Sequence, residues 1–432
     1  MSTTPRGTAE QHLRRNFIFF GLDSIFFPLG LVFLDVDTVL TTFMTNLTDS
    51  KLLIGLLATM FGLYWGLPQI IAGNYAARLE HKKPYLIRVT VFGRLSIPLL
   101  ALYMKLTNGE PAWLTIVVLF LALGVLLTTD AMGSVAWLDI LGRAFPTERR
   151  GGFMALWNIA KGVLSIGVAS LIGLLLSESG LAYPDNYTLI FVGAVIFQLL
   201  STISLMAIVE PDLAEHEVGA VVIHWNEFGS YVRRVFTEDA RMRRLAIGKV
   251  LYQAMRMASP FYVVYAIERF DFPVASIGLF IIAQNVGPLI ANLVLGQVSD
   301  RFGAHRVLQF GTAFIMTAPV LALALPLLGL DRAGLEAAFL WIYVCLGMVG
   351  PVMFLGYTNY ALDITPGGQR SIYMGIINAV ASLGLLGAML GGFILDTFSY
   401  PVLFALSLLM GVGALLMVSQ LKHVRAETVS VA

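Results

Sequence analysis

A few ionisable side chains interrupt long apolar stretches of this sequence, and they are the residues that could do chemistry. Asp35 and Asp37 stand in the apolar stretch 18–45, and Arg256 stands in the stretch 242–267. A charge inside a membrane is costly and is usually retained for function. We therefore expect Asp35 or Asp37 to take up and release a proton, and Arg256 to bind an anionic group or to keep the carboxylate ionised. The alternative is a satisfied ion pair, or an aspartate that caps an outer helix turn.

A second pair of charges lies in two other apolar stretches, 112–140 and 152–177. Asp130 and Lys161 sit at comparable depth, each roughly 15–20 Å from the predicted cytoplasmic boundary at about 1.5 Å per residue. We expect the two to be partners across adjacent helices, because burying either charge alone is expensive. A static ion pair is the favoured role.

Uncharged amides in the apolar stretches form a third group of candidates. They could hydrogen-bond a substrate, and the alternative is a structural role in holding helices together. The residues are Gln284, Asn285, Asn158, Asn378 and Asn359.

The composition requires lipid as the solvent for most of the chain. Of the 432 residues, 57% are hydrophobic and 13% are charged, whereas soluble proteins carry about 25% charged residues. A membrane-crossing helix needs about 20 apolar residues. Twelve stretches are predicted to span: 18–45, 52–74, 85–106, 112–140, 152–177, 187–209, 242–267, 273–297, 305–329, 335–362, 371–395 and 399–420.

The distribution of Lys and Arg predicts the orientation of these spans. An even number of spans places both chain ends on the same side. With both ends in the cytoplasm, the cytoplasmic segments hold 20 basic residues and the outer loops hold 4. This bias favours cytoplasmic termini. We expect a multi-pass protein of the plasma (inner) membrane.

The chain contains an internal repeat. Pro146, Arg150 and Asn158 recur 220 residues later as Pro366, Arg370 and Asn378. Repeated halves in the same orientation are typical of transporters whose substrate site lies between the halves, near the membrane midplane. An offset of 221 pairs Asp35 in the first half with Arg256 in the second.

The loop after the eighth span carries a recognisable pattern. It reads Gly296-x-x-x-Asp300-Arg301-x-Gly303-x-x-Arg306 and resembles the signature loop of the major facilitator superfamily. The span count, the long central loop and the half repeat extend the resemblance over nearly the whole chain. It implies alternating access by rocking of two six-helix halves, with the first and seventh spans facing each other across a cavity. Asp35 and Asp37 would then lie opposite Arg256.

The resemblance also implies a cytoplasmic gate. The first-half copy of the loop contributes Gly73 and Arg78, but has Ala77 where an acidic residue is expected. We therefore expect the latch to depend on Gly296, Asp300, Arg301, Gly303 and Arg306. Charges repeat at the inner ends of the fourth, fifth, tenth and eleventh spans, and they are candidates for the same gate: Asp139, Arg150, Asp363 and Arg370. Simple helix termination is the alternative for this last set.

Several function classes are disfavoured by the sequence. A net charge of +1 argues against nucleic acid as a partner. All six histidines fall in predicted cytoplasmic segments, so no intramembrane metal site is expected, and no phosphate-binding GxxxxGK[ST] loop is present. We expect no cofactor. The fifth span lacks the proline-containing glycine motif of drug–proton antiporters.

Together these observations predict an all-α integral membrane protein of twelve spans in two pseudo-symmetric six-helix bundles. The predicted division is a bundle over 1–209, a cytoplasmic linker over 210–240 and a second bundle over 241–432. We expect a monomeric, proton-coupled secondary transporter of a small solute and no enzymatic activity. The alternatives are a multidrug or metabolite efflux antiporter, an intramembrane enzyme and a non-transporting sensor.

Overall fold

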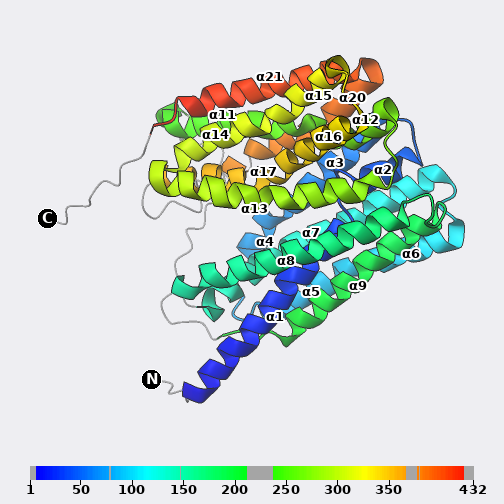
Figure 1. The fold of residues 1–432 in the computed structure, drawn as a ribbon. Helices are drawn as coiled ribbons and strands as arrows, with labels where there is room; N and C mark the ends of the chain where they lie inside the picture. The colour runs from blue at the N-terminus through cyan, green and yellow to red at the C-terminus, as the bar shows by residue number, and fades with distance from the viewer. Residues whose placement is uncertain are drawn as a thin grey trace. The chain divides into compact units, whose positions relative to one another are not determined.

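The computed structural model describes residues 6–76, 79–145, 147–211, 237–365, 377–378 and 380–422. Every regular element in this part of the chain is helical (Figure 1). The first half contains α1 (Arg6–Val32), α2 (Val39–Thr45), α3 (Lys51–Gly66), α4 (Pro68–Ala76), α5 (Lys83–Arg94), α6 (Ser96–Thr107), α7 (Ala112–Ala144), α8 (Thr147–Leu175) and α9 (Asp185–Ala207).

The second half contains shorter and more interrupted helices. They are α11 (Ala240–Met255), the 3-10 turn η1 (Arg256–Ala258), α12 (Phe261–Phe270), α13 (Ser276–Phe302), α14 (Ala304–Ile315), α15 (Thr317–Leu328), α16 (Arg332–Gly347), α17 (Val349–Pro351), the π-helical η2 (Val352–Thr358), α18 (Asn359–Ile364), the 3-10 turn η3 (Ser382–Leu386), α20 (Gly387–Thr397) and α21 (Tyr400–Ser419).

The predicted spans are mostly helical where the chain is described, but residues 33–38, 67 and 259–260, among others, interrupt them. Nine rods in the described residues are long and apolar enough to cross a membrane. The three predicted spans that do not meet this length are 52–74, 242–267 and 371–395, and they are built from shorter helices. Residues 371–376 and 379 of the last one lie outside the described part.

Prolines explain most of the breaks within these rods. A proline lacks an N–H and clashes with the preceding turn, so a helix tends to end just before it. The breaks between α3 and α4, between α5 and α6, and between η1 and α12 lie at or just before Pro68, Pro98 and Pro260. The π-helical η2 begins directly after Pro351. The sequence prediction of unbroken spans was wrong at these points.

Contacts divide the described residues into two compact units. Unit 1 contains the described residues within Met1–Asp49, Met60–Val222 and Ile267–Ile282, and unit 2 contains those within Ser50–Thr59, Ile223–Ala266 and Ala283–Ala432. The first turns of α3 therefore pack in unit 2, and the start of α13 packs in unit 1. Residues 212–236 of the predicted linker lie outside the described part, and the predicted division at 209 and 241 stays a prediction.

Each unit has its own apolar core. In unit 1, α1 packs against α8 and α9, and α5 packs against α7 (Figure 1). Phe20, Trp137, Phe145 and Trp157 meet there, with ring centroids 5.4–5.8 Å apart along the series. In unit 2, α11 packs against α21. Buried Tyr252 belongs to the cluster of buried hydrophobic residues that forms the core of this unit.

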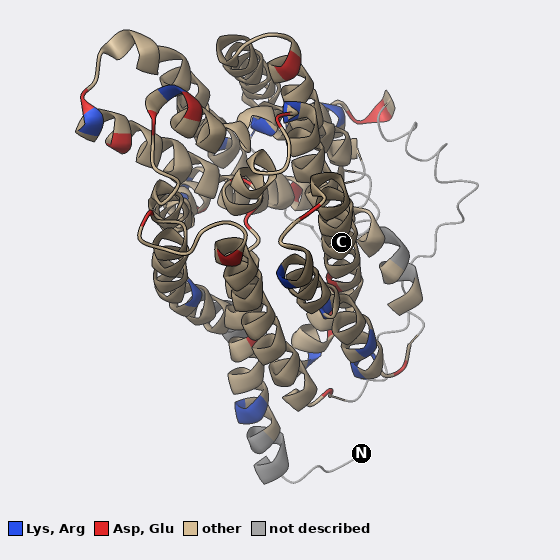
Figure 2. Ribbon diagram, turned by 90° about the vertical axis from the view of Figure 1, so that its right-hand side faces the viewer, with Lys and Arg blue, Asp and Glu red and all other residues tan. Residues whose placement is uncertain are grey.

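The outward-facing surfaces are apolar as well. Leu106 is 74% exposed and Leu327 is 86% exposed, and most of the ribbon carries neither acidic nor basic residues (Figure 2). In water this would be a large aggregation-prone surface. In a bilayer the same surface faces lipid, and helices satisfy their own backbone hydrogen bonds.

A carboxylate from α20 caps the start of α3 within unit 2. Asp396 Oδ1 accepts a hydrogen bond from the Lys51 N–H at 2.8 Å, and Asp396 Oδ2 accepts one from the Leu52 N–H at 2.9 Å. The Ser50 hydroxyl donates to the same carboxylate at 3.2 Å. The first N–H groups of a helix lack partners in the helix itself. Asp396 supplies those partners across a tertiary contact, and it complements the helix dipole.

Replacing this cap should destabilise the protein. We expect Asp396→Ala to cost about 1 kcal/mol of unfolding free energy, because loss of a helix cap costs about that much. Thermal unfolding in detergent measures the effect. Asp185→Ala is the matched control, because Asp185 forms an exposed ion pair with Lys105 and such pairs contribute little. Equal melting temperatures for the two variants would contradict the capping role.

Candidate functional site

Unit 1 holds a buried cluster of one arginine and two aspartates. Arg94 ends α5, Asp130 lies on α7, and Asp23 lies on α1. Arg94 Nη2 is 3.3 Å from Asp130 Oδ1. The Arg94 Nη1–H group donates to the hydroxyls of Ser201 at 2.8 Å and Thr202 at 2.9 Å on α9. Four helices therefore converge on a single guanidinium.

Ser201 connects the arginine to the second aspartate. Its hydroxyl accepts from Arg94 and donates to Asp23 Oδ1. The other oxygen of Asp23 accepts from the Trp137 Nε1–H group at 2.8 Å. The result is a continuous chain of hydrogen bonds and an ion pair from Asp130 through Arg94 and Ser201 to Asp23.

The charges of this cluster do not balance. Asp23, Arg94 and Asp130 are each at most 6% exposed, and full ionisation would leave one excess negative charge. Asp130 Oδ2 and Arg94 Nε are buried and have no hydrogen-bond partner among the described residues. An uncompensated buried charge is expensive. One bound proton, or one bound cation, would neutralise the cluster.

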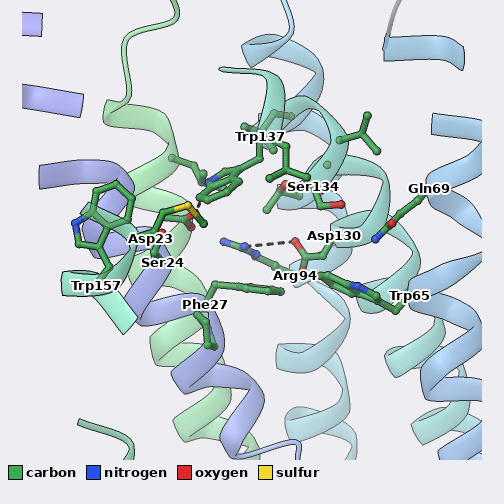
Figure 3. Close-up of a pocket in the computed structure, with 18 of the residues that line it drawn as sticks. Asp23, Ser24, Phe27, Trp65, Gln69, Arg94, Asp130, Ser134, Trp137 and Trp157 are labelled. Carbon is green, nitrogen blue, oxygen red and sulfur yellow. Dashed lines mark hydrogen bonds and ion pairs between the residues drawn. The ribbon is translucent and has the colours of Figure 1, made fainter. Parts of the chain in front are cut away.

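A cavity of about 450 Å³ opens beside the cluster (Figure 3). Its walls include Asp23, Arg94 and Asp130 together with the polar side chains of Ser24, Gln69, Ser134 and Asn158 and the aromatic side chains of Phe27, Trp65, Trp137 and Trp157. The Phe27 ring centroid lies 5.3 Å from Arg94 Cζ, within range of a cation–π contact. Figure 3 shows the Arg94–Asp130 ion pair facing this space. The cavity can enclose a small organic solute between rings and charges.

A glycine allows the two helices to approach closely at the ion pair. A Cβ atom at Gly93 would overlap the side chain of Thr129 on α7. Because Gly93 and Thr129 are the direct neighbours of Arg94 and Asp130, this close approach brings the two charges together. Arg94 also sits in the last turn of α5, where the helix dipole favours a cation.

Comparison with known proteins identifies the fold family. Residues 245–429 match the family model of the Major Facilitator Superfamily. The solved structures of a variant of the nucleoside transporter NupG (TM-score 0.67, 14% identity, 95% of this chain and 100% of the other) and of an auto-inhibited POT family peptide transporter (TM-score 0.65, 12% identity, 96% and 98%) are similar over the full length. A bacterial metal transporter is also similar (TM-score 0.61, 16% identity, 94% and 98%). No curated protein sequence matches.

Residues 245–429 therefore belong to the major facilitator superfamily, and the chain as a whole shares the fold of these solved transporters. It is a multi-pass membrane protein and a secondary transporter, and the predicted fold class is confirmed. The superfamily consists of transporters rather than enzymes. Its members move small molecules across membranes, so a small-molecule substrate and a lipid bilayer are the partners that follow.

In the structure, Asp130 has a different partner from the predicted Lys161. Asp130 pairs with Arg94, and Lys161 on α8 forms no ion pair among the described residues. The predicted Asp130–Lys161 pair was wrong. Depth along a helix can be read from the sequence, but the direction in which a side chain points depends on how the helices are rotated and packed.

Asp35 and Asp37 lie in a turn rather than inside a helix. Helix α1 ends at Val32, and α2 begins at Val39. Asp35 Oδ1 accepts from the Asp37 N–H at 3.1 Å and from the Thr38 hydroxyl at 2.6 Å. Asp35 thus stabilises the turn before α2, close to the capping alternative, and neither aspartate lines the cavity of unit 1. Their proposed coupling role stays a prediction.

Arg256 lies in unit 2, where α11 gives way to η1. Its Nη1–H group donates weakly to Gln253 Oε1 at 3.4 Å, and its buried Nε has no partner. Lys249, seven residues earlier, donates to Asn378 Oδ1 at 2.8 Å. Neither Arg256 nor Lys249 forms an ion pair among the described residues. Both cations are therefore available to an anionic group.

The predicted amides are spread over both units. Asn158 on α8 lines the cavity of unit 1, and its Nδ2–H group donates to the Met154 carbonyl at 2.9 Å. Gln284 and Asn285 lie on α13, and Asn359 begins α18. Asn378 contacts Lys249. Apart from Asn158, none of the predicted amides lines this cavity.

The predicted gate residues are placed only in part. Gly73 lies on α4, Asp363 lies on α18, and Gly296, Asp300 and Arg301 lie on α13. Gly303 turns the chain into α14 with a φ of +83°, a conformation that favours glycine, and Arg306 donates to Gln309 at 2.8 Å. Arg78 and Arg370 lie outside the described residues, as does the side chain of Arg150. The gate stays a prediction.

Asp139 belongs to a compact charge network at the end of α7. It pairs with Lys82 and with Arg143, whose Nε lies 2.7 Å from Asp139 Oδ1. Arg143 Nη2 lies 2.8 Å from Glu210 Oε1. Glu210 also accepts from the Lys82 and Lys83 N–H groups at 2.8 and 2.9 Å. The network fastens the chain after α9 to the start of α5.

Sequence reasoning missed Asp23 and Arg94, although a usable signal was present. Both are ionisable residues inside predicted spans, 18–45 and 85–106, so the rule that selected Asp35 applies equally to them. The sequence does not show that they share one serine. That contact joins α1, α5 and α9, which are far apart in the chain.

Removing the arginine should leave two orphaned carboxylates. We expect Arg94→Ala to cost roughly 3–5 kcal/mol, as for other broken buried ion pairs, and the additional change Asp130→Asn to restore part of that loss. Melting temperatures in detergent measure both effects. Lys161→Ala is the control and should change stability far less. A larger loss for Lys161→Ala than for Arg94→Ala would reinstate the Asp130–Lys161 pair.

The Glu210 network should weaken in acid. Burial alone would raise the pKa of Glu210, but the Lys82 and Lys83 N–H groups and Arg143 outweigh it and hold the pKa below its usual value. A depressed pKa contributes stability above the ordinary glutamate pKa, and that stability is lost as the pH falls through the lowered value.

We therefore expect Glu210→Gln to lower the melting temperature at pH 7, with the difference from wild type shrinking below about pH 4. Glu336→Gln on α16 should show no such dependence. A Glu210→Gln difference that grows in acid would contradict this role.

Proposed function

We propose that this transporter couples the movement of a small anionic solute to protons through the Asp23–Arg94–Asp130 cluster. The observation that carries the proposal is the unequal charge count of the cluster: two buried carboxylates share one guanidinium. Protonation of one carboxylate removes the excess charge. Asp130 is the proposed proton acceptor, because its buried Oδ2 atom has no hydrogen bond among the described residues and because the residue lines the cavity.

Proton binding would also change the contacts of the arginine. With Asp130 neutral, the ion pair at 3.3 Å loses its Coulomb attraction, and Arg94 keeps its hydrogen bonds to Ser201 and Thr202. The guanidinium would then stabilise Asp23 through Ser201. Such an exchange of partners links a proton to the packing of α1, α5, α7 and α9, which is what a coupled transporter requires.

The preference for an anionic solute rests on unit 2. Lys249 lies on α11 and Arg256 begins η1 seven residues later, and neither has an acidic partner in the described chain. An unpaired guanidinium with a buried, unsatisfied Nε–H group is suited to a carboxylate or phosphate.

We propose that both six-helix halves rock in alternating access, that the termini are cytoplasmic, and that the protein acts as a monomer in the plasma (inner) membrane.

One observation favours a second candidate, a broad-specificity efflux antiporter. The cavity of unit 1 presents Phe27, Trp65, Trp137 and Trp157 beside an excess negative charge, a combination that suits flat organic cations. Extrusion of cationic dyes by cells or vesicles that contain the protein would support this candidate over anion uptake.

The test is solute-driven proton movement in proteoliposomes that enclose a pH-sensitive dye. A panel of small anions, zwitterions and cations of similar size is added outside. For wild type we expect anionic solutes to carry protons across. Asp130→Asn and Asp23→Asn should abolish this flux and retain exchange of labelled solute, because a permanently neutral side chain still permits binding.

Lys161→Gln is the matched control, since Lys161 is a half-buried cation of the same unit with no ion pair in the described residues. It should retain proton flux within a few-fold. Accumulation of a solute by wild type without any proton movement would overturn the coupling proposal. A flux of solute that is driven by the pH gradient and persists in both aspartate variants would also overturn it.

A further inference from the structure

A second cavity opens on the surface of unit 1. It lies near the ends of the spans that are predicted to face the cytoplasm. It measures about 520 Å³. Its polar lining comes from Tyr75 on α4, His81 in the following loop, and Tyr85 and Arg88 on α5. Apolar residues complete the walls: Ala72, Leu79, Pro84, Val89 and Met132. We call this cavity the tyrosine groove.

Helix α5 presents different faces to the two cavities of unit 1. Leu86 and Thr90 line the cavity beside Arg94, whereas Tyr85 and Arg88 line the tyrosine groove. Four residues after Arg88, and therefore on the same face of the helix, Phe92 is 65% exposed. An exposed phenylalanine on a membrane-spanning rod faces lipid. Arg88 thus points toward the bilayer and not toward the transport cavity.

Arg88 is a cation that no acidic residue in the described part of the chain neutralises. It is exposed and has neither an ion pair nor a hydrogen bond among the described residues. It lies five residues into α5, about 7–8 Å from the helix start, near the predicted cytoplasmic end of this span. The neighbouring Lys82 is already paired with Asp139, and Lys83 donates to the carbonyl groups of Met206 and Ile208.

A tyrosine in the groove also lacks a partner. The Tyr85 hydroxyl is buried without a hydrogen bond in the described chain, and its ring packs at 5.3 Å from the Tyr75 ring. A buried hydroxyl without a partner costs roughly 1–3 kcal/mol. An oxygen-rich anion between Arg88 and Tyr85 would satisfy both groups. Glu80, an exposed acid next to His81, is the nearby charge that opposes such an anion.

We propose that the tyrosine groove binds the headgroup phosphate of an anionic phospholipid. Arg88 forms the ion pair, Tyr85 donates a hydrogen bond, and the acyl chains lie on the apolar wall formed by Val89 and Met132. A lipid fits better than a soluble anion because the groove opens on a lipid-facing side and is mostly apolar. Cytoplasmic leaflets rich in anionic lipid attract such basic sites.

The test measures lipid binding to the purified full-length protein in a neutral detergent. Dioleoyl phosphatidylglycerol and dioleoyl phosphatidylcholine are titrated separately, with thermal stability and native mass spectrometry as readouts. We expect phosphatidylglycerol to bind more tightly and to raise the melting temperature more. Arg88→Gln should weaken the phosphatidylglycerol preference roughly tenfold or more, since a hydrogen bond to a charged group contributes about 1.5–3 kcal/mol. Tyr85→Phe should weaken it less.

Two controls make the result specific. Arg306→Gln removes a basic residue of unit 2 that contacts Gln309, and it should keep the full preference. Arg88→Lys retains the charge and should keep part of it, so it serves as the test if Arg88→Gln does not fold. Inorganic phosphate and glycerol 3-phosphate, titrated at millimolar concentration, distinguish a soluble anion from a lipid.

Three outcomes would overturn the proposal. The two lipids could bind equally to wild type. The preference could survive in both Arg88 variants and in Tyr85→Phe. Free phosphate could stabilise the protein as strongly as phosphatidylglycerol and displace it, which would make the groove a soluble-anion site. None of these readouts depends on transport, so the proposal stands or fails apart from the proposed coupling mechanism.

Discussion

The structure of unit 1 depends on how one buried guanidinium is neutralised. Arg94 is surrounded by Asp130, Ser201 and Thr202, and it reaches Asp23 through the serine hydroxyl. An arginine cannot lose its proton at accessible pH, so burying it obliges the surrounding helices to bring acids and hydroxyls to it. The presence of two acids, where one would suffice, leaves a charge that only a proton or a bound cation can remove.

That requirement links local sequence to helix packing. The small surface of Gly93 lets α5 approach α7 at Thr129, and the ion pair forms one residue farther along each helix. The adjoining cavity, walled by aromatic rings, shares the same side chains. A change in the charge of Asp130 therefore acts on the packing of α5 against α7 and on the cavity wall together. This coupling of protonation to packing is the physical basis of the proposed transport mechanism.

Unit 1 presents charge to two different environments. Helix α5 directs Arg94 to the interior and Arg88 to the outer surface. The interior cation has its partners in the protein, and the outer cation has none among the described residues. At the end of α7, the network of Lys82, Asp139, Arg143 and Glu210 holds the chain after α9 against the start of α5. Basic residues thus have three roles in unit 1. Arg94 pairs with an acid inside the bundle, Lys82 and Arg143 join the network at the end of α7, and Arg88 is exposed on the lipid-facing side.

The sequence by itself determined the fold class and the helical spans. Apolar length depends only on residue type and membrane thickness, so it can be read along the chain, and the repeat and the Gly296–Arg306 pattern identified the superfamily. Even the breaks at Pro68 and Pro260 have a local cause that the sequence contains.

Only the tertiary structure decided which charges meet. Asp130 and Lys161 lie at similar predicted depth, yet Asp130 pairs with Arg94. Asp35 accepts hydrogen bonds from Asp37 and Thr38 of its own turn. Asp23 and Arg94 carried the same sequence signal as Asp35, but their connection runs through a serine 178 residues from Asp23. Pairing of this kind depends on the rotation and close approach of helices distant in the chain, and those quantities are set by packing rather than by hydropathy.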